Sequence, residues 1–348
     1  MKILYTICGD GNGHAFRSSV VIDHLLACGH DVFIVSSGKA YKYLAQRYPQ
    51  HLEVNGLKLE YSGTRVKKSR TITKNLAKVK SLPQDLRALG EVVKSFRPTV
   101  IITDFEPSAS VLASFYDLPL ICIDNQHIIS DTKLPIKRQD YPDYVVTKVY
   151  TESVAPNRDY SLITTFFFPP LKKSREGKSW LFPPLIRPEV NAAQPQAGDY
   201  FFCYLTADCF DQFGEVLYQT GEKFIIYNAA RRDFGPRFQF KEFSPSGVVN
   251  DLAGARGVVI NGGFTLMSES LYLGKPILSM PIKMQYEQIL NARMIEALGL
   301  GLMTKELTAD VFNSWHSQLS RFTQVVKTLT FSNQLLLSKL DELLTTIR

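Results

Sequence analysis

Residues 257–292 read GVVINGGFTLMSESLYLGKPILSMPIKMQYEQILNA, an order that predicts a strand, a Gly-Gly turn, a helix, a second strand, a polar loop and a second helix. Residues 257–260 are apolar and mostly β-branched, as in a buried parallel strand. The helix that opens after Gly262 and Gly263 would present backbone N–H groups to an anion such as a diphosphate. Glu269 lies one turn after Thr265 on the same helix face, where a carboxylate can accept both hydroxyl groups of a ribose.

A plain βαβ unit with a glycine turn is the simpler interpretation, but the order Gly-Gly, Thr/Ser, Glu, Pro and Glu-Gln-x-x-Asn-Ala favours a nucleotide-sugar site. The segment resembles the nucleotide-binding motif of the GT-B glycosyltransferases, which include the UDP-glycosyltransferases and the bacterial transferase that adds N-acetylglucosamine to lipid I. The resemblance implies that Glu269 holds the ribose, that Gly262, Gly263 and Thr265 hold the diphosphate, and that Glu287 and Gln288 hold the donor sugar. Asn261 stands where many relatives have a His, and its amide can donate a hydrogen bond but carries no charge.

Length and composition predict a soluble protein of two domains. The chain has 348 residues, of which 45% are hydrophobic and 21% charged, values typical of globular proteins. No stretch reaches the roughly 18 apolar residues of a membrane-spanning helix, and a strand at the first residues leaves no signal peptide. The five cysteines are scattered and form no Cys-x-x-Cys, which argues against disulfides and a zinc site and favours the cytoplasm.

Positive charge is concentrated in the N-terminal half. Residues 1–190 hold 26 Lys and Arg against 18 Asp and Glu, a balance of +8, whereas the remainder holds 14 against 15, a balance of −1. Seven basic residues and no acidic one lie between Arg65 and Lys80. A solvated helix face explains such a run, but the asymmetry favours an anionic partner such as lipid headgroups or a phosphorylated acceptor. We therefore expect peripheral contact with the inner face of the membrane, and nucleic acid is the less favoured partner.

Strand and helix patterns alternate, which predicts an α/β fold with parallel sheets. In the first half we expect strands at 3–8, 31–36, 57–61, 99–103 and 118–123, separated by helices at 14–28, 40–48, up to 96, and 108–116. Residues 144–150, 161–167 and 180–182 are expected to extend that sheet. In the second half we expect strands at 200–205, 223–227, 237–240, 257–260 and 275–281, with helices at 210–220, 247–253, 311–319 and 333–347.

A proline-rich linker around Pro183 and Pro184 separates the predicted domains, because paired prolines do not fit inside helices. We expect an acceptor-binding domain at residues 1–184 and a donor-binding domain at 185–332. The GT-B resemblance implies two Rossmann-like domains with a cleft between them, and a last helix at 333–348 that packs back on the first domain.

A glycine-rich loop, Gly9-Asp10-Gly11-Asn12-Gly13-His14, joins the first strand to the first helix. Its third glycine comes too early for the dinucleotide fingerprint Gly-x-Gly-x-x-Gly. The loop resembles the N-terminal Gly-x-Gly-His loops of the same GT-B families, which implies that Gly11, Asn12 and Gly13 let a ligand approach. His14 is then a candidate for the base that takes the proton of the acceptor hydroxyl, and Arg17, one turn on, could contact phosphate.

Further polar residues follow neighbouring strands and should meet at one sheet edge, since ligands bind at the carboxyl ends of parallel strands. Asp104 could orient His14 or act as the base itself, and His127 is a further binding candidate. Glu106 and Asp124 rank below them, because capping or turn formation explains such residues well. In the second domain, the resemblance places Thr206 at a phosphate loop whose usual glycines are absent, and Phe243 at the nucleobase.

These observations predict a metal-independent glycosyltransferase that uses a UDP-sugar as co-substrate and no cofactor. The acceptor is unidentified, and an anionic, lipid-linked saccharide fits the charge best. No Asp-x-Asp occurs in the chain, so the metal-binding motif of the other large glycosyltransferase fold is missing. A UDP-sugar 2-epimerase remains an alternative because Asp104, Glu106 and Asp124 could supply acid–base groups. A catalytically silent nucleotide-sugar sensor or nucleic-acid-binding protein is the alternative from another class.

Overall fold

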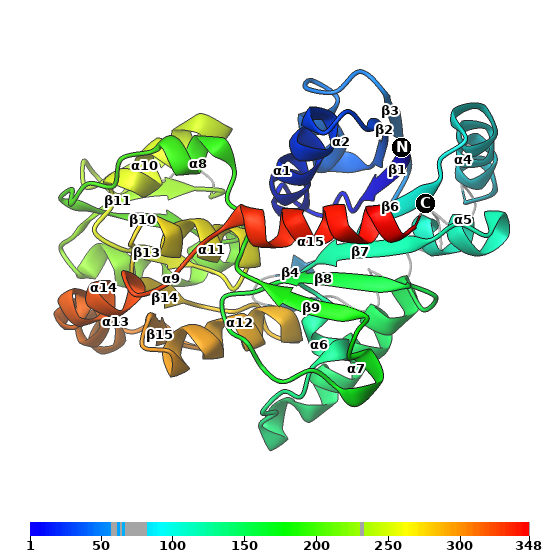
Figure 1. Cartoon of the computed structure of the whole chain (residues 1–348). Coiled ribbons are helices and arrows are strands. Elements are labelled where there is room, and N and C mark those ends of the chain that lie inside the picture. Colours follow the sequence, from blue (N-terminus) through cyan, green and yellow to red (C-terminus); the bar gives the residue numbers. More distant parts are fainter. Residues whose placement is uncertain (57–60, 63–64, 67–81, 230–232, 348) are drawn as a thin grey trace. The chain divides into compact units, whose positions relative to one another are not determined.

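A computed structural model describes residues 1–56, 61–62, 65–66, 82–229 and 233–347. The chain forms two compact units. Unit 1 comprises Met1–Glu60, Lys67–Arg187 and Ser332–Arg348, and unit 2 comprises Tyr61–Val66 and Pro188–Phe331. Each unit contains one large parallel sheet with helices on its faces (Figure 1), which confirms the predicted fold class of two Rossmann-like domains.

The sheet of unit 1 has seven strands in the order β3-β2-β1-β6-β7-β8-β9, and every neighbouring pair is parallel. Its strands are β1 (Lys2–Ile7), β2 (Asp31–Ser36), β3 (His51–Glu53), β6 (Val100–Asp104), β7 (Leu120–Asp124), β8 (Tyr160–Thr164) and β9 (Ser179–Phe182). Its helices are α1 (Gly13–Ala27), α2 (Gly38–Leu44), α4 (Leu82–Phe96), α5 (Ser108–Tyr116), α6 (Ile128–Asp131), α7 (Tyr141–Val154) and α15 (Asn333–Thr346).

Alternate residues of the central strands supply two cores on opposite faces of this sheet. Ile3, Tyr5 and Ile7 pack in one cluster with apolar residues of α1, α2 and α15, whereas Leu4 packs in another with residues of α4 and α5. The helix α15 runs along the first of these faces (Figure 1) and buries Leu336, Leu337, Leu340, Leu343 and Leu344. Residues from far along the sequence therefore complete the core of unit 1.

The sheet of unit 2 has six parallel strands in the order β12-β11-β10-β13-β14-β15. They are β10 (Tyr200–Tyr204), β11 (Lys223–Tyr227), β12 (Phe238–Lys241), β13 (Val258–Ile260), β14 (Ile277–Ser279) and β15 (Gly301–Met303). The helices are α8 (Pro188–Ala192), α9 (Ala207–Gln219), α10 (Pro245–Gly254), α11 (Phe264–Tyr272), α12 (Tyr286–Ala297), α13 (Ala309–Ser317) and α14 (Leu319–Val326). Its core is rich in aromatic rings, and both Phe201 and Phe312 contact the rings of Phe224 and Trp315 as well as each other.

One predicted strand of the first half is wrong, and another lies almost wholly outside the described residues. Residues 144–150 belong to the helix α7 and form no strand; the β-branched run Val145-Val146 favours extended structure, but the helix starts with Pro142 in its first turn, where proline is well accommodated. The third strand pairs with β2 at His51–Glu53. The strand predicted at 57–61 lies outside the described residues except for Tyr61, which is in β4 (Tyr61–Ser62), paired with β5 (Arg65–Val66).

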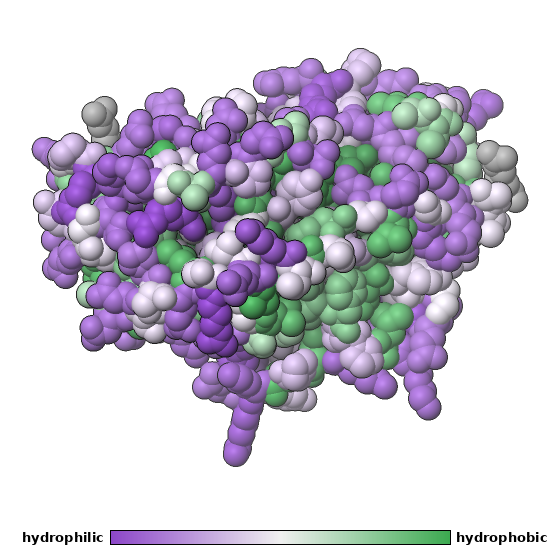
Figure 2. Space-filling model, turned by 60° about the vertical axis from the view of Figure 1, so that its left-hand side comes forward, coloured by the Kyte–Doolittle hydropathy of each residue, from purple (hydrophilic) through white to green (hydrophobic). Residues whose placement is uncertain are grey.

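The surface in the view of Figure 2 is mainly hydrophilic, with apolar side chains gathered in patches. Among the described residues, none of the helices combines the length and the apolar character needed to cross a bilayer. The basic run between Arg65 and Lys80, on which the predicted membrane contact rests, lies almost wholly outside the described residues.

Candidate active site

His14 and Asp104 meet at the carboxyl edge of the unit 1 sheet. The strands β1 and β6 are paired with Ile7 opposite Asp104, and α1 starts just after β1, so the register brings both side chains to one place. His14 Nδ1 lies 2.7 Å from Asp104 Oδ1. We assign the proton to Nδ1 because a carboxylate only accepts. His14 Nε2 then carries a lone pair, and the side chain is 13% exposed.

Asp104 is fully buried and receives hydrogen bonds from three further donors. Arg17 donates from Nε at 2.9 Å and from Nη2 at 2.5 Å, and Ser18 Oγ donates at 3.0 Å. Burial opposes ionisation, but the charge of Arg17 and the hydrogen bonds from Arg17 and His14 outweigh it and lower the pKa of Asp104 to about 2. Of the two roles predicted for Asp104, this geometry favours orienting His14, because its oxygens are already engaged.

Arg17, predicted as a phosphate ligand, is itself buried and directs its guanidinium to Asp104. Its Nη2 also lies 3.1 Å from His14 Nδ1. Ser18 was not predicted, because its hydrogen bond to Asp104 depends on which face of α1 turns toward β6. The positions i, i+3 and i+4 of that helix carry His14, Arg17 and Ser18, a spacing that places all three on one face.

The glycine-rich loop is tightly held at one end and open at the other. A Cβ atom at Gly9 would lie 2.3 Å from the backbone oxygen of Ser37, so only glycine fits there. Gly11 has a φ of +93° with nothing within 4 Å of a Cβ atom, which leaves room beside the loop. Asn12 is the N-cap of α1 without a side-chain capping bond, and Gly13 is the first helical residue. The loop thus leaves space beside Gly11, three residues before His14.

A second His–Asp pair follows β7, but it is enclosed. His127 Nδ1 lies 2.6 Å from Asp124 Oδ2, the backbone N–H of His127 donates to Asp124 Oδ1, and both side chains are fully buried. His127 Nε2 has no hydrogen-bond partner among the described residues. A binding role for His127, as predicted, would therefore need its surroundings to open.

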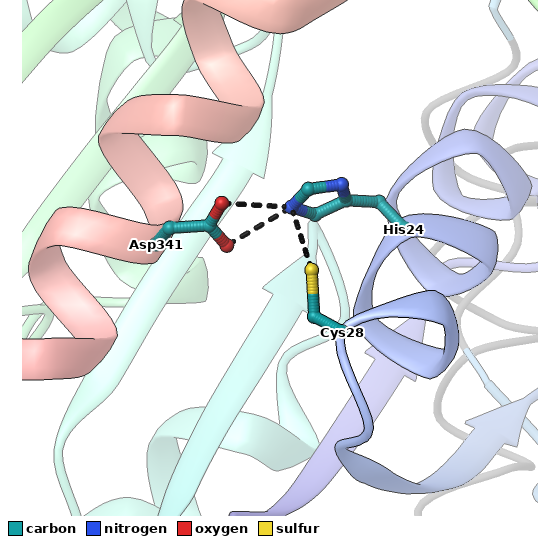
Figure 3. Close-up of side chains that lie close together, drawn as sticks. All are labelled: His24, Cys28 and Asp341. Atoms are coloured by element: carbon teal, nitrogen blue, oxygen red, sulfur yellow. Dashed lines mark hydrogen bonds and ion pairs between the residues drawn. The ribbon is translucent and has the colours of Figure 1, made fainter.

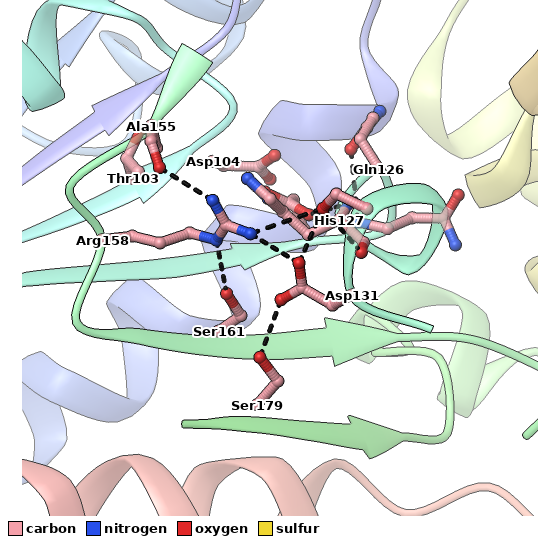
Figure 4. Close-up of polar contacts among 12 residues, drawn as sticks. Thr103, Asp104, Gln126, His127, Asp131, Ala155, Arg158, Ser161 and Ser179 are labelled. Atoms are coloured by element: carbon pink, nitrogen blue, oxygen red, sulfur yellow. Dashed lines mark hydrogen bonds and ion pairs between the residues drawn. The ribbon is translucent and has the colours of Figure 1, made fainter. Parts of the chain in front are cut away.

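A buried ionic network lies below His127 and was not foreseen from the sequence. Figure 4 shows the guanidinium of Arg158 pointing at Asp131, with Ser161 and Ser179 beside them. Arg158 Nη2 lies 2.5 Å from Asp131 Oδ1, and Arg175 Nε lies 3.1 Å from Oδ2. Although burial acts the other way, Arg158 and its neighbours lower the pKa of Asp131 to about 2. The network ties α6 to β8 and β9.

In unit 2, four of the predicted donor-site residues are joined by hydrogen bonds. Asn261 Oδ1 accepts from the backbone N–H of Thr206 at 2.8 Å, and its amide donates to the carbonyl of Met280 at 2.7 Å. Gln288 Oε1 accepts from the backbone N–H of Gly262 at 3.0 Å and from that of Ile282 at 3.1 Å. These contacts hold together the ends of β10, β13 and β14.

The same contacts change what Gly262 and Gln288 can offer a ligand. The N–H of Gly262 is used by Gln288, so the diphosphate donors expected at this turn would come from Gly263 and the first turn of α11. A Cβ atom at Gly262 would lie 2.5 Å from the backbone oxygen of Gln288, whereas at Gly263 it would meet nothing within 4 Å. Glycine is therefore required by packing at Gly262 and leaves open space at Gly263.

The remaining predicted donor residues lie on the same side of unit 2. Thr265 is in the first turn of α11, Glu269 is buried on that helix, and Glu287 is half-buried in the first turn of α12. Phe243 follows β12 and is 42% exposed. The Thr206 hydroxyl is buried without a partner among the described residues. Because all strands are parallel, β10, β12, β13 and β14 end at one edge, where these residues gather.

Known proteins resemble this chain in sequence and in fold. A family model described as Glycosyl transferase family 1 matches residues 1–320. An uncharacterized glycosyltransferase of Methanosarcina mazei is 24% identical over 336 residues, covering 87% of this chain and 85% of that protein.

Solved structures of glycosyltransferases share the fold. Phytolacca americana UGT2, complexed with UDP-2fluoro-glucose and pterostilbene, superposes with a TM-score of 0.69 at 14% identity, covering 99% of this chain and 98% of that one. The spinosyn rhamnosyltransferase SpnG, complexed with thymidine diphosphate, superposes with a TM-score of 0.61 at 15% identity, covering 94% and 95%. The two parallel-sheet units are those of the GT-B fold.

Proposed function

The chain belongs to glycosyl transferase family 1 and is a glycosyltransferase, and we propose that it moves a sugar from a UDP-sugar to a lipid-linked acceptor without a metal ion. The observation that carries the chemistry is the contact between His14 and the buried, ionised Asp104. A histidine held this way by a carboxylate has one proton fixed on Nδ1 and Nε2 ready to accept another.

In the proposed reaction, His14 Nε2 takes the proton of the acceptor hydroxyl while its oxygen attacks the anomeric carbon of the donor. The bond between that carbon and the diphosphate oxygen breaks, and the electron pair leaves with UDP. The imidazolium that forms is stabilised by Asp104, which stays ionised. A single displacement of this kind inverts the anomeric centre, so the stereochemistry of the product tests it directly.

The proposed donor site is the carboxyl edge of the unit 2 sheet. The N-terminus of α11, capped by Gly263 without a side-chain bond, would offset the negative charge of the leaving diphosphate. Glu269 would hold the ribose, and Glu287 with the amide of Gln288 would hold the sugar. The UDP-sugar analogue on UGT2 and the thymidine diphosphate on SpnG support a pyrimidine nucleotide, and we favour uracil.

The acceptor proposal rests on the exposed face of α7. Tyr141, Val145, Val146, Val149 and Tyr150 recur at helical spacing and are all exposed, Val149 by 60%. Apolar residues on a solvent-facing helix stripe are unusual, and a patch of this kind indicates a binding surface.

Positive charge borders this face. An open hollow at the start of α7 is lined by Lys137, Arg138, Gln139 and Pro142. Apolar side chains beside cations match the acyl chains and phosphates of a membrane surface. This combination supports a lipid-linked, anionic acceptor that is reached at the membrane.

The donor assignment is tested by thermal shift with UDP, TDP, ADP and UDP-sugars. We expect UDP to raise the melting temperature of the wild type but not that of Glu269→Ala. The matched control is Glu306→Ala, at an exposed glutamate, and UDP should raise its melting temperature as it does for the wild type. An equal shift in Glu269→Ala would refute the ribose contact. A larger rise in melting temperature with TDP than with UDP would show that the site prefers thymine to uracil.

The chemistry is tested by product analysis. Incubation with UDP-N-acetylglucosamine and an extract of lipid-linked saccharides should give a lengthened glycolipid and UDP, with activity retained in EDTA and lost in His14→Ala. Formation of the 2-epimer of the sugar nucleotide without acceptor would identify an epimerase instead. Binding of UDP-sugars with no turnover by any acceptor would identify a silent sensor.

A further inference from the structure

Three potential metal ligands meet where α1 contacts α15, away from the proposed active site. His24 and Cys28 are one turn apart at the end of α1, and Asp341 lies on α15 (Figure 3). One ligand atom from each side chain lies within 4.8 Å of the others. Ten residues of helix separate His24 from His14, which is about 15 Å along the axis. The cluster is therefore no part of the transfer chemistry.

The distances suit a tetrahedral ion. His24 Nε2 lies 2.9 and 3.0 Å from the two oxygens of Asp341 and 3.7 Å from Cys28 Sγ. Zinc bonds of about 2.0–2.3 Å at tetrahedral angles place a nitrogen and a sulfur ligand about 3.6 Å apart, and a nitrogen and an oxygen ligand about 3.4 Å apart. A movement of a few tenths of an ångström in Asp341, which is 41% exposed, would bring its oxygen to this distance from His24 Nε2.

The chemistry of the three groups is also that of a zinc site. Imidazole, thiolate and carboxylate are the usual zinc ligands, and solvent can supply the fourth. Cys28 is the one exposed cysteine of the five, so an ion can reach it. A second set, Cys122, Asp124 and His127, is fully buried, and Asp124 already binds both N–H groups of His127. That set offers no entry path.

We propose that His24, Cys28 and Asp341 bind one zinc-type divalent ion that fastens α15 to α1. The helix α15 already contributes five buried leucines to unit 1, and Asn333 at its start exchanges two hydrogen bonds with the backbone of Ile186. The ion adds a fixed point two turns further along the helix. Its ligands come from positions 24, 28 and 341, so no sequence motif marks the site.

The experiment uses the full chain without an affinity tag, titrated with Co²⁺ and followed by absorption. We expect one Co²⁺ per chain and a thiolate-to-cobalt charge-transfer band that Zn²⁺ abolishes by displacement. The band should be absent in Cys28→Ser and present in Cys122→Ser. Because even an outer partner of a metal ligand is worth about 10–100-fold in affinity, Asp341→Asn should weaken binding at least about tenfold. Glu342→Gln, its exposed neighbour on α15, should bind as the wild type does.

A second readout reports the fastening of α15. Zn²⁺ should raise the melting temperature of the wild type and of Glu342→Gln, and leave those of His24→Gln and Asp341→Asn unchanged. The proposal is overturned by a wild type that binds no Co²⁺, which leaves a simple His24–Asp341 ion pair. It is also overturned by a charge-transfer band that survives in Cys28→Ser or disappears in Cys122→Ser.

Discussion

Asp104 is the residue on which the proposed active site depends, because it joins a base to a buried cation. Its carboxylate faces His14 on one side and Arg17 on the other, with no exposed surface of its own. Removing a single charge from such a group leaves its partner uncompensated in the interior. Asp104 thus affects both catalysis and stability. A variant of Ser18, which donates to the same carboxylate, helps to separate the two effects.

The variant Asp104→Asn should lose both activity and stability. We expect kcat to fall by about 10²–10⁴, the usual contribution of an oriented acid–base group, and the free energy of unfolding to fall by about 3–5 kcal/mol because Arg17 is left unpaired. Ser18→Ala removes one hydrogen bond to the same carboxylate and should cost about 1 kcal/mol with little change in kcat. Steady-state kinetics and urea unfolding measure the two quantities. Full activity in Asp104→Asn would exclude the orienting role.

Gly262 and Gly263 are adjacent but should respond differently to alanine. A Cβ atom at Gly262 collides with the backbone of Gln288, so Gly262→Ala should destabilise unit 2 by about 1–3 kcal/mol. Gly263 has a φ of −68° and open space, so Gly263→Ala should change stability by less than about 1 kcal/mol. If the diphosphate lies against Gly263, Gly263→Ala should still weaken UDP binding. Urea midpoints and UDP thermal shifts distinguish these effects, and equal stability of both variants would contradict the packing argument.

At the scale of elements, α7 combines a buried and an exposed face in an unusual way. Thr151 and Val154 are buried at its end, whereas the stripe from Tyr141 to Tyr150 faces outward. No stability is gained by leaving such side chains in water.

Replacing part of the α7 stripe should weaken membrane binding without harming the fold. The double variant Val146→Ser/Val149→Ser should cosediment with anionic phospholipid vesicles at least several-fold less than the wild type, because it removes apolar contact area. Its melting temperature should stay within a few degrees, since both side chains are exposed. Phe115→Ser, at a 79% exposed site on α5, is the matched control and should bind vesicles normally. Unchanged cosedimentation of the double variant would remove the support for a membrane-bound acceptor.

Helices and strands whose ends are marked by proline or glycine were predicted closely from the sequence. The bounds of α5 and β11 match the prediction because Pro107 precedes the helix and Gly221 precedes the strand. The helix α7 was predicted as a strand despite Pro142 in its first turn, because its apolar residues face outward and their run mimics a buried strand. The meeting of His14 with Asp104 was anticipated from parallel topology alone. The burial of Arg17 and His127 was not, because it depends on side-chain packing that no local pattern encodes.

At the scale of the molecule, acid sensitivity is concentrated in unit 1. Asp104 and Asp131 both belong to it, and their pKa values are lowered from 3.8 to about 2. A carboxyl group whose pKa is lower in the folded state stabilises the fold at pH values above its pKa in the unfolded state. This stabilisation is lost as the pH falls through the pKa of the folded state. Each group should therefore contribute about 2 kcal/mol at neutral pH that disappears between about pH 4 and pH 2.

Unfolding by urea at a series of pH values tests this distribution. Between pH 4 and pH 2, Asp131→Asn should show a shallower decline of stability than the wild type, because the variant no longer loses that contribution. Its stability at pH 7 should be lower, since Arg158 and Arg175 lose their partner. Glu306→Ala, at an exposed carboxylate of unit 2, should follow the wild type throughout. Parallel curves for Asp131→Asn and the wild type would contradict the assignment.

The place of α15 in the core of unit 1 has a consequence for synthesis on the ribosome. Unit 2 ends at Phe331, so all of its residues are made before α15. Unit 1 is begun first, but the five leucines that cover one face of its sheet are made after unit 2. Until they emerge, the nascent chain exposes apolar strand residues such as Ile3 and Ile102, a kind of surface that chaperones bind. The half of the protein that is translated first is therefore completed only after the other half has been made.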